Sequence, residues 1–96
     1  MHFYTIKEAI RGGIKVRIRV PEGEGVAELH LLGRNRRGET LVRAYLVEGP
    51  RKLRGWRLLR LAKIEQAVET GETFTTPRPG YKQRDPAMVG GIIERF

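Results

Sequence analysis

The segment from Ile14 to Val20 constrains the fold more than any other part of the chain. Its apolar and cationic residues alternate without exception, as Ile-Lys-Val-Arg-Ile-Arg-Val. Successive side chains of a β-strand point to opposite faces, whereas a helix repeats every 3.6 residues. The alternation therefore predicts a strand with one buried face and one solvated face, which needs neighbouring elements to cover its apolar side.

Further segments bounded by glycine, proline or asparagine also have the pattern of strands. They are Val26–Leu32, Glu39–Glu48, Arg54–Ile64, Glu65–Thr70 and Ile92–Phe96. One short helix is expected at the N-terminus, because Thr5 and Glu8 have the spacing of a capping box and Gly12-Gly13 supplies a left-handed stop. About five short strands and one helix predict a mainly β protein, either a small antiparallel β-barrel or a strongly bent sheet.

The length and the residue types limit the protein class. At 96 residues the chain is expected to form one domain, with 76–96 as an extended tail that contains a helical turn at Pro86–Met88 and the final strand. The absence of cysteine excludes disulfides, thiolate metal sites and a cysteine nucleophile. No apolar run reaches the ~18 residues of a membrane span, and the N-terminus lacks the core of a signal peptide. We therefore expect a cytoplasmic protein with no membrane partner.

Positive charge is concentrated in one part of the chain. Between Arg34 and Arg60, nine cations stand against two glutamates, a surplus of seven in a chain whose net charge is +8. A single basic block of this kind is the electrostatic footprint of an anionic partner, most often nucleic acid. Fourteen of the 19 cations are arginine, which holds phosphate bidentately and stacks on bases, although codon bias or adaptation to heat would also raise that number.

Aromatic residues lie beside cations in two of the expected strands. Arg43 and Tyr45 are two residues apart and share a strand face, and Trp56 precedes Arg57 and Arg60. An arginine beside an aromatic ring can serve one nucleotide, by holding the phosphate and stacking on the base. The predicted nucleic-acid site therefore uses the three arginines on phosphates and the two rings on bases. The surrounding cations are expected to widen this track: Arg34, Arg36, Arg37, Arg51, Lys52 and Arg54.

Each of these residues also has a purely structural interpretation. The arginines can line the rim of a small barrel and pair with Glu65 or Glu69, and Tyr45 can pack with its hydroxyl in water. The sequence has no Ser-His-Asp set, no ligand cluster with metal spacing and no glycine-rich phosphate loop. His2 and His30 are the only histidines, and we expect His30 to be a hydrogen-bonded strand residue. The chain is therefore expected not to be an enzyme and to need no metal or cofactor.

Several segments resemble the WYL domain, a small Sm-like or SH3-like β-barrel named after a Trp-Tyr-Leu run. Arg57–Ile64 resembles the family's Arg-x-Phe-Arg-Leu-Asp-Arg-Ile strand, and Arg43–Val47 stands in the place of the preceding conserved strand. Leu59 and Ala62 stand where the family has an aromatic residue and an acid. The remaining matching segments are Lys7–Ile10 and Ile14–Val20 at the start of the domain, and Pro77–Tyr81 and Asp85–Met88, which resemble the tail of a small stand-alone subgroup.

The resemblance implies a fold and a role. The fold is an Sm-like or SH3-like antiparallel barrel of about five strands with a short N-terminal helix, formed by residues 1–96 as one domain. The role is a non-catalytic module that binds single-stranded RNA or DNA, or senses a nucleotide, in a bacterial or phage regulatory or defence context. The same fold implies self-association through edge strands. An alternative from another class is a protein-interaction or homo-oligomeric assembly module that has no nucleic-acid ligand.

Overall fold

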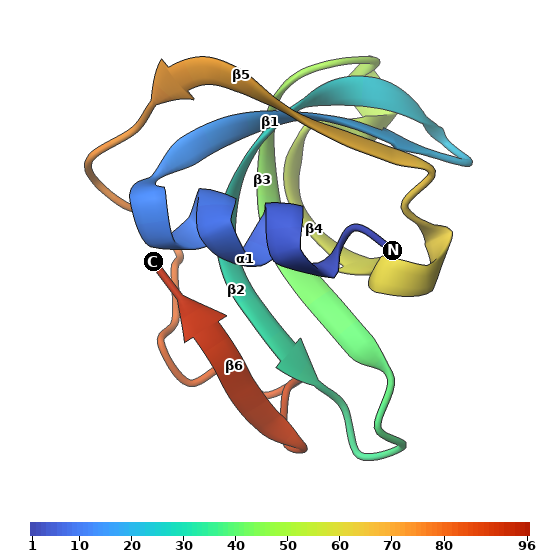
Figure 1. The fold of residues 1–96 in the computed structure, drawn as a ribbon, viewed down its shortest axis with the longest axis vertical. Helices are drawn as coiled ribbons and strands as arrows, with labels where there is room; N and C mark the ends of the chain where they lie inside the picture. The colour runs from blue at the N-terminus through green and yellow to red at the C-terminus, as the bar shows by residue number, and fades with distance from the viewer.

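The computed structural model describes all 96 residues and is mainly β, as the sequence predicted (Figure 1). One α-helix, six strands and two short 3-10 helices follow one another along the chain. They are α1 (Phe3–Gly12), β1 (Ile14–Val20), β2 (Gly23–Arg34), β3 (Thr40–Glu48), η1 (Arg51–Leu53), β4 (Gly55–Arg60), η2 (Leu61–Lys63), β5 (Gln66–Thr73) and β6 (Gly91–Arg95). All the strand pairs are antiparallel.

The strands form one bent sheet in the order β4-β3-β2-β1-β5, with β6 paired to β2. Strand β2 is the centre of this sheet, because its first half pairs with β1 and its second half with β6, while β3 follows its other edge. The two edge strands β4 and β5 do not pair with each other, so the sheet is not closed. The sheet thus has six strands rather than about five, and it remains open where a barrel was expected.

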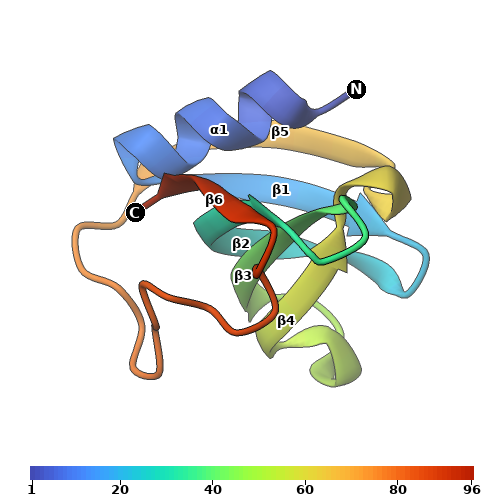
Figure 2. The ribbon, with the colours of Figure 1, turned by 90° about the horizontal axis from the view of Figure 1, so that it is seen from below.

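The core lies on the sheet face that α1 covers (Figures 1 and 2). The helix contributes Ile6, Ala9 and Ile10, all fully buried, at the i, i+3, i+4 spacing that places them on one face. Strand β1 confirms its predicted alternation, since Val16, Ile18 and Val20 are buried while its two arginines in the second half are exposed. A second, smaller cluster on the other face of the sheet consists of Leu31, Leu41 and Met88.

The predicted start of the helix was wrong. The helix begins at Phe3 with His2 in the N-cap position, and no side chain caps it. Phe3 packs against the core, so tertiary packing adds a turn before the expected capping box, and Thr5 and Glu8 lie inside the helix. The predicted stop is confirmed: Gly13 has φ of 63°, and a Cβ atom there would lie 2.6 Å from the carbonyl oxygen of Phe74.

The predicted strand Arg54–Ile64 was also wrong in its extent. Strand β4 ends at Arg60, which pairs with Leu41 near the first residue of β3, so the strand has no further partner beyond that point. The η2 turn then carries the chain across to β5 on the opposite edge. The helical turn expected at Pro86–Met88 is a single turn, closed by the Met88 N–H donating to the carbonyl oxygen of Asp85.

The segment between β5 and β6, residues 74–90, has no regular secondary structure and is called the tail segment below. It runs along the side of the sheet away from α1 (Figure 2). Met88 in this segment packs in the smaller cluster, which ties the segment to β2 and β3. No helix in the structure has the length and apolar character needed to cross a membrane.

Candidate functional site

The face of β3 and β4 away from α1, called the outer face below, carries the aromatic and cationic residues singled out in the sequence. Tyr45 lies directly opposite Trp56, Arg43 opposite Leu58, and Leu41 opposite Arg60. Directly opposed residues in an antiparallel pair project to the same side. The intervening residues of β3, which include the fully buried Val42 and Ala44, project into the core.

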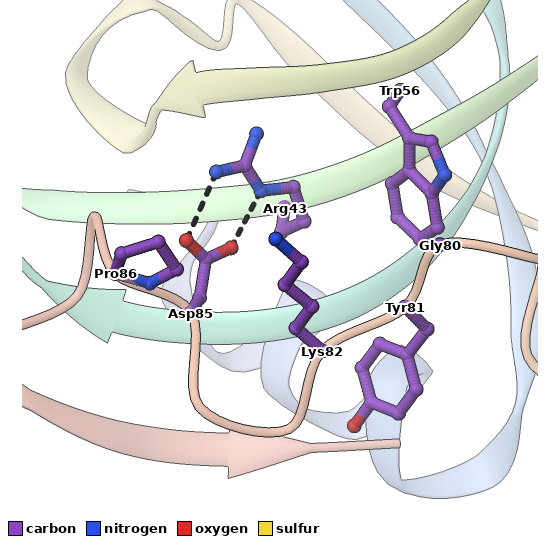
Figure 3. Close-up of a pocket in the computed structure, with 7 residues that line it drawn as sticks. All are labelled: Arg43, Trp56, Gly80, Tyr81, Lys82, Asp85 and Pro86. Atoms are coloured by element: carbon purple, nitrogen blue, oxygen red, sulfur yellow. Dashed lines mark hydrogen bonds and ion pairs between the residues drawn. The ribbon is translucent and has the colours of Figure 1, made fainter.

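Three polar contacts hold the tail segment against this outer face. The indole Nε1–H of Trp56 donates to the carbonyl oxygen of Pro79 at 2.8 Å. Arg78 forms a two-pronged ion pair with Glu28 of β2, at 2.7 and 3.1 Å. Arg43 forms a second two-pronged pair with Asp85, at 2.6 and 3.0 Å (Figure 3). Paired N–H···O bonds from a guanidinium are strong and directional, so these contacts fix the path of the tail segment.

Both carboxylates of these pairs are buried. The side chain of Glu28 is 3% exposed, and the Lys15 ammonium lies 3.8 Å from its Oε2. The hydrogen bond from Arg43 holds the pKa of Asp85 below its ordinary value. The hydrogen bond to Glu28 likewise raises the pKa of Arg78. Asp85 is therefore ionised at neutral pH, and its ion pair with Arg43 holds the tail segment under those conditions.

His30 links β2 to the tail segment at a β-bulge. Leu29 pairs with Ala44 and Leu31 with Arg43, which leaves His30 as the extra residue. Its Nδ1–H donates to the carbonyl oxygen of Glu28 at 2.9 Å, and its Nε2 accepts from the backbone N–H of Arg78 at 3.2 Å. These bonds require the neutral ring, and burial lowers its pKa. The expectation of a hydrogen-bonded strand histidine is confirmed.

Aromatic rings surround this histidine. The ring centroids of Trp56, Tyr81, Phe74 and Phe96 lie between 4.7 and 5.8 Å from that of His30. Three of these four rings come from residues 74–96, so the C-terminal part of the chain builds the cluster. Trp56 and Tyr81 therefore belong both to this cluster and to the wall of the cavity described next.

A cavity of about 210 Å³ lies between the outer face and the tail segment (Figure 3). Its lining residues are Arg43, Trp56, Gly80, Tyr81, Lys82, Asp85 and Pro86. In Figure 3 the Trp56 and Tyr81 rings lie on one side of the cavity, the Arg43–Asp85 pair lies on the other, and the Lys82 side chain extends between them. The cavity therefore combines two aromatic rings with two cations and one carboxylate.

Hydrogen bonds within the protein engage the carboxylate of this cavity and leave two cationic donors free. Asp85 accepts from Arg43 through both oxygens, and its Oδ1 also accepts from the Ala87 N–H at 3.0 Å. The Nη1 of Arg43 and the Nζ of Lys82 have no hydrogen-bond partner in the protein, and the Tyr81 hydroxyl donates to the carbonyl oxygen of Phe96. The side chains of the cavity thus offer N–H donors to a ligand.

The structure brings four of the five residues that the sequence analysis placed at the centre of the site to the outer face, which are Arg43, Tyr45, Trp56 and Arg60. Trp56 is half-buried in the cavity wall beside Arg43. The Tyr45 ring lies under the guanidinium of Arg78, 5.0 Å from its centroid, and meets the edge of Trp56. Arg57 lies on the core-facing side of β4, where it donates to the carbonyl oxygens of Trp56 and Lys52 and secures the connection before β4.

The surrounding cations form two groups at opposite ends of the β3–β4 ladder. The first, called the turn group, is Arg34, Arg36, Arg37 and Arg60, at and beside the β2–β3 turn. The only carboxylate there is Glu39, whose pKa a hydrogen bond from Asn35 lowers and which lies 3.8 Å from Arg37. The second, called the η1 group, is Arg51, Lys52 and Arg54, all exposed and without a carboxylate partner.

Sequence reasoning missed three residues of the cavity: Tyr81, Lys82 and Asp85. A signal was available, since an aromatic residue directly followed by a lysine repeats the pairing of ring and cation seen in β3 and β4. These residues meet Arg43 and Trp56 only because the tail segment folds back over the outer face. Arg43 and Asp85 are 42 residues apart in the chain, and no local sequence pattern predicts their contact. The structure has no cluster of three or more His, Cys, Asp or Glu side chains that could hold a metal ion.

No protein-family model, curated protein or solved structure matches this chain. The resemblance to WYL domains therefore stays a prediction from the sequence.

Proposed function

We propose that this protein is a non-catalytic module that binds single-stranded nucleic acid along β4 and the adjoining cavity. One observation carries the proposal: the cavity at Trp56 lies between two groups of cations, most of which have no carboxylate partner. An aromatic ring flanked by unpaired cations supplies both interactions that a single strand needs, base stacking and phosphate neutralisation.

The spacing of the two groups supports a ligand of several nucleotides. The β3–β4 ladder has six residue pairs, from Leu41–Arg60 to Leu46–Gly55. At ~3.4 Å per residue the two ends of the ladder are roughly 17 Å apart. At ~3.4 Å per stacked nucleotide, this length corresponds to about five nucleotides. A strand laid along β4 would bring its phosphates to the turn group at one end and to the η1 group at the other.

The form of the cavity favours a single strand over a duplex. Its wall combines the half-buried Trp56 with Tyr81, and both rings are reached only by a base that has left its stack. A base in a single strand is already free to turn outward, whereas a duplex would have to open first, at a cost of a few kcal/mol.

The fold and setting that we propose follow the resemblance to WYL domains. The helix α1, the bent antiparallel strands and the η2 turn between β4 and β5 support an opened form of the Sm-like barrel. We propose a cytoplasmic protein that acts in nucleic-acid regulation or defence, without a metal or cofactor.

The salt dependence of binding tests the proposal. Fluorescence anisotropy with a labelled 12-nucleotide single strand should show log affinity falling with log salt at a slope of roughly −3.5, for about five neutralised phosphates. The double variant Arg34→Gln/Arg60→Gln should flatten this slope by about 1.4. The matched control Arg17→Gln/Arg19→Gln removes the same charge from β1, where each arginine pairs with a glutamate, and should change the slope less. A slope near zero for the unmodified protein would exclude the proposal.

A second candidate function, homo-oligomeric assembly, is favoured by the opposite charges of the two open edges. The segment 49–63 around β4 contains six cations and no carboxylate, whereas 64–77 around β5 contains three glutamates and no cation. Unpaired edge strands of opposite charge are suited to pair between copies. Light scattering in low and high salt, with and without an oligonucleotide, separates the two functions, because assembly through these edges depends on salt and is indifferent to nucleic acid.

A further inference from the structure

The cavity at Trp56 has a one-sided hydrogen-bonding character that bears on base selection. We propose that it selects uracil, thymine and guanine, which carry an exocyclic oxygen at O4 or O6, over cytosine and adenine, which carry an amino group at the corresponding position. This inference rests on the proposed function, since it concerns which base of a bound strand enters the cavity. Its test below distinguishes a failure of selection from a failure of binding.

Donors in the cavity are free and charged. The Nη1 of Arg43 is the one guanidinium nitrogen that Asp85 does not engage, and Figure 3 shows it turned away from that carboxylate. Lys82 is exposed, and its ammonium group has neither a hydrogen-bond nor an ion-pair partner. Hydrogen bonds from charged donors are stronger than neutral ones. An exocyclic oxygen, such as O4 of uracil or O6 of guanine, would therefore gain a bond at this position.

The only carboxylate of the cavity already accepts three hydrogen bonds within the protein. Both oxygens of Asp85 accept from Arg43, and one also accepts from Ala87. An amino group, such as N4 of cytosine or N6 of adenine, would place its N–H groups against these cations without a free carboxylate to accept them. A buried donor left without a partner loses its hydration and is disfavoured. An exocyclic oxygen at this position therefore strengthens binding of the base, and an amino group at the same position weakens it.

The rings that would hold the base are fixed before any ligand binds. Trp56 is held by its bond to Pro79, and Tyr81 by its bond to the carbonyl oxygen of Phe96 at 3.1 Å. Gly80 has φ of 95°, and a Cβ atom there would lie 3.0 Å from the indole nitrogen, so glycine permits this close approach. A wall that is already ordered holds the base at a defined distance from Arg43 and Lys82, which selection requires.

The size of the cavity sets the limit of what it selects. A volume of about 210 Å³ is below the ~300–1,000 Å³ of pockets that enclose a drug-sized ligand. One base therefore fits, with its sugar and phosphate outside near the flanking cations. Selection should then act on one base of the strand and leave the contacts to the other nucleotides unselective.

The test compares two single strands that differ at the decisive group. Oligomers of 12 uridines and 12 cytidines have equal charge and pyrimidine bases. They differ in O4 against N4 and in N3, which carries a hydrogen in uracil and is an acceptor in cytosine. Anisotropy at pH 7.5 should show the uridine oligomer binding roughly tenfold tighter, as expected for one charged hydrogen bond gained against one donor left unpaired. Lys82→Met should bring the ratio below about threefold, whereas Lys82→Arg, which keeps a charged donor, should preserve it.

A matched control separates selection from charge. Lys63→Met removes one exposed cation from η2, outside the cavity, and should weaken both oligomers equally while the ratio stays near tenfold. Because Lys82 makes no contact that holds the fold, its variants should keep the circular dichroism spectrum of the parent protein. Equal binding of both oligomers with a steep salt slope would overturn base selection and leave the proposed function standing. A tenfold ratio that persists in Lys82→Met would also overturn it, and no binding of either oligomer would overturn both.

Discussion

Replacing Arg78 with methionine should loosen the tail segment by a predictable amount. The Glu28 side chain is 3% exposed and would keep only the Lys15 ammonium at 3.8 Å as a partner. Breaking a fully buried ion pair costs about 3–5 kcal/mol, but the Arg78 side chain is 40% exposed and its charge is partly screened. We therefore expect Arg78→Met to lower the free energy of unfolding by about 2–3 kcal/mol.

Urea denaturation followed by circular dichroism measures the stability of the sheet, and Trp56 fluorescence reports on the tail segment separately. Because the Trp56 indole bonds to Pro79, release of the tail segment without unfolding of the sheet would shift its emission to the red before any urea is added. The double variant Glu28→Gln/Arg78→Met also removes the buried carboxylate that Arg78→Met leaves without its partner. It should therefore recover more than half of the lost free energy of unfolding. A loss under about 0.5 kcal/mol by both probes, or no recovery in the double variant, would refute this account of the pair.

Three further predictions concern the histidine, a glycine and the core. Burial lowers the pKa of His30, so the unfolded chain binds more protons than the folded chain below about pH 6.5. The free energy of unfolding should therefore be constant above about pH 7 and fall toward pH 5. His30→Gln should reduce this fall in stability. Gly13→Ala should lower the free energy of unfolding by about 1–3 kcal/mol, because Gly13 has a left-handed φ and an added Cβ would meet the Phe74 carbonyl oxygen. Gly38→Ala should lower it less in the same urea titration, because no atom lies within 4 Å of a Cβ added at Gly38. Ile10→Ala should cost about 2–5 kcal/mol, while Leu58→Ala, at a side chain on the exposed outer face, should stay under about 1 kcal/mol in thermal unfolding.

Elements defined by their own residues could be predicted from the sequence. The strand Ile14–Val20 has the bounds and the burial that its alternation implies, because a period of two is a local property of the chain. The end of β4 was missed because it depends on where β3 begins, and that is decided by pairing rather than by the residues after Arg60. Likewise, the helix starts at Phe3 because that ring packs on a core assembled from distant segments.

The candidate site divides in the same way. Pairing of β3 with β4 could be anticipated, and it brings Arg43, Tyr45 and Trp56 to one face. Arg57 and Trp56 are adjacent in β4 and therefore lie on opposite faces of the sheet. The position of Arg78 over the Tyr45 ring and the cavity at Trp56 could not be predicted from the sequence. Both depend on the path of the tail segment between β5 and β6 across the outer face.

The distribution of ion pairs indicates what the surplus charge does. On β1, Arg17 and Arg19 each lie within 4 Å of a glutamate, and in the tail segment Arg78 has Glu28, so these three cations have carboxylate partners. The η1 group has none, and the turn group shares Glu39 alone. Like charges gathered without counter-charges repel one another and oppose folding, so structural needs do not account for their placement. A polyanion lying across both groups would relieve that repulsion, and release of its counterions would add to the binding free energy. The same charges would then be destabilising in the free protein and stabilising in the complex, so neutralising either group should raise the stability of the free protein while weakening its affinity.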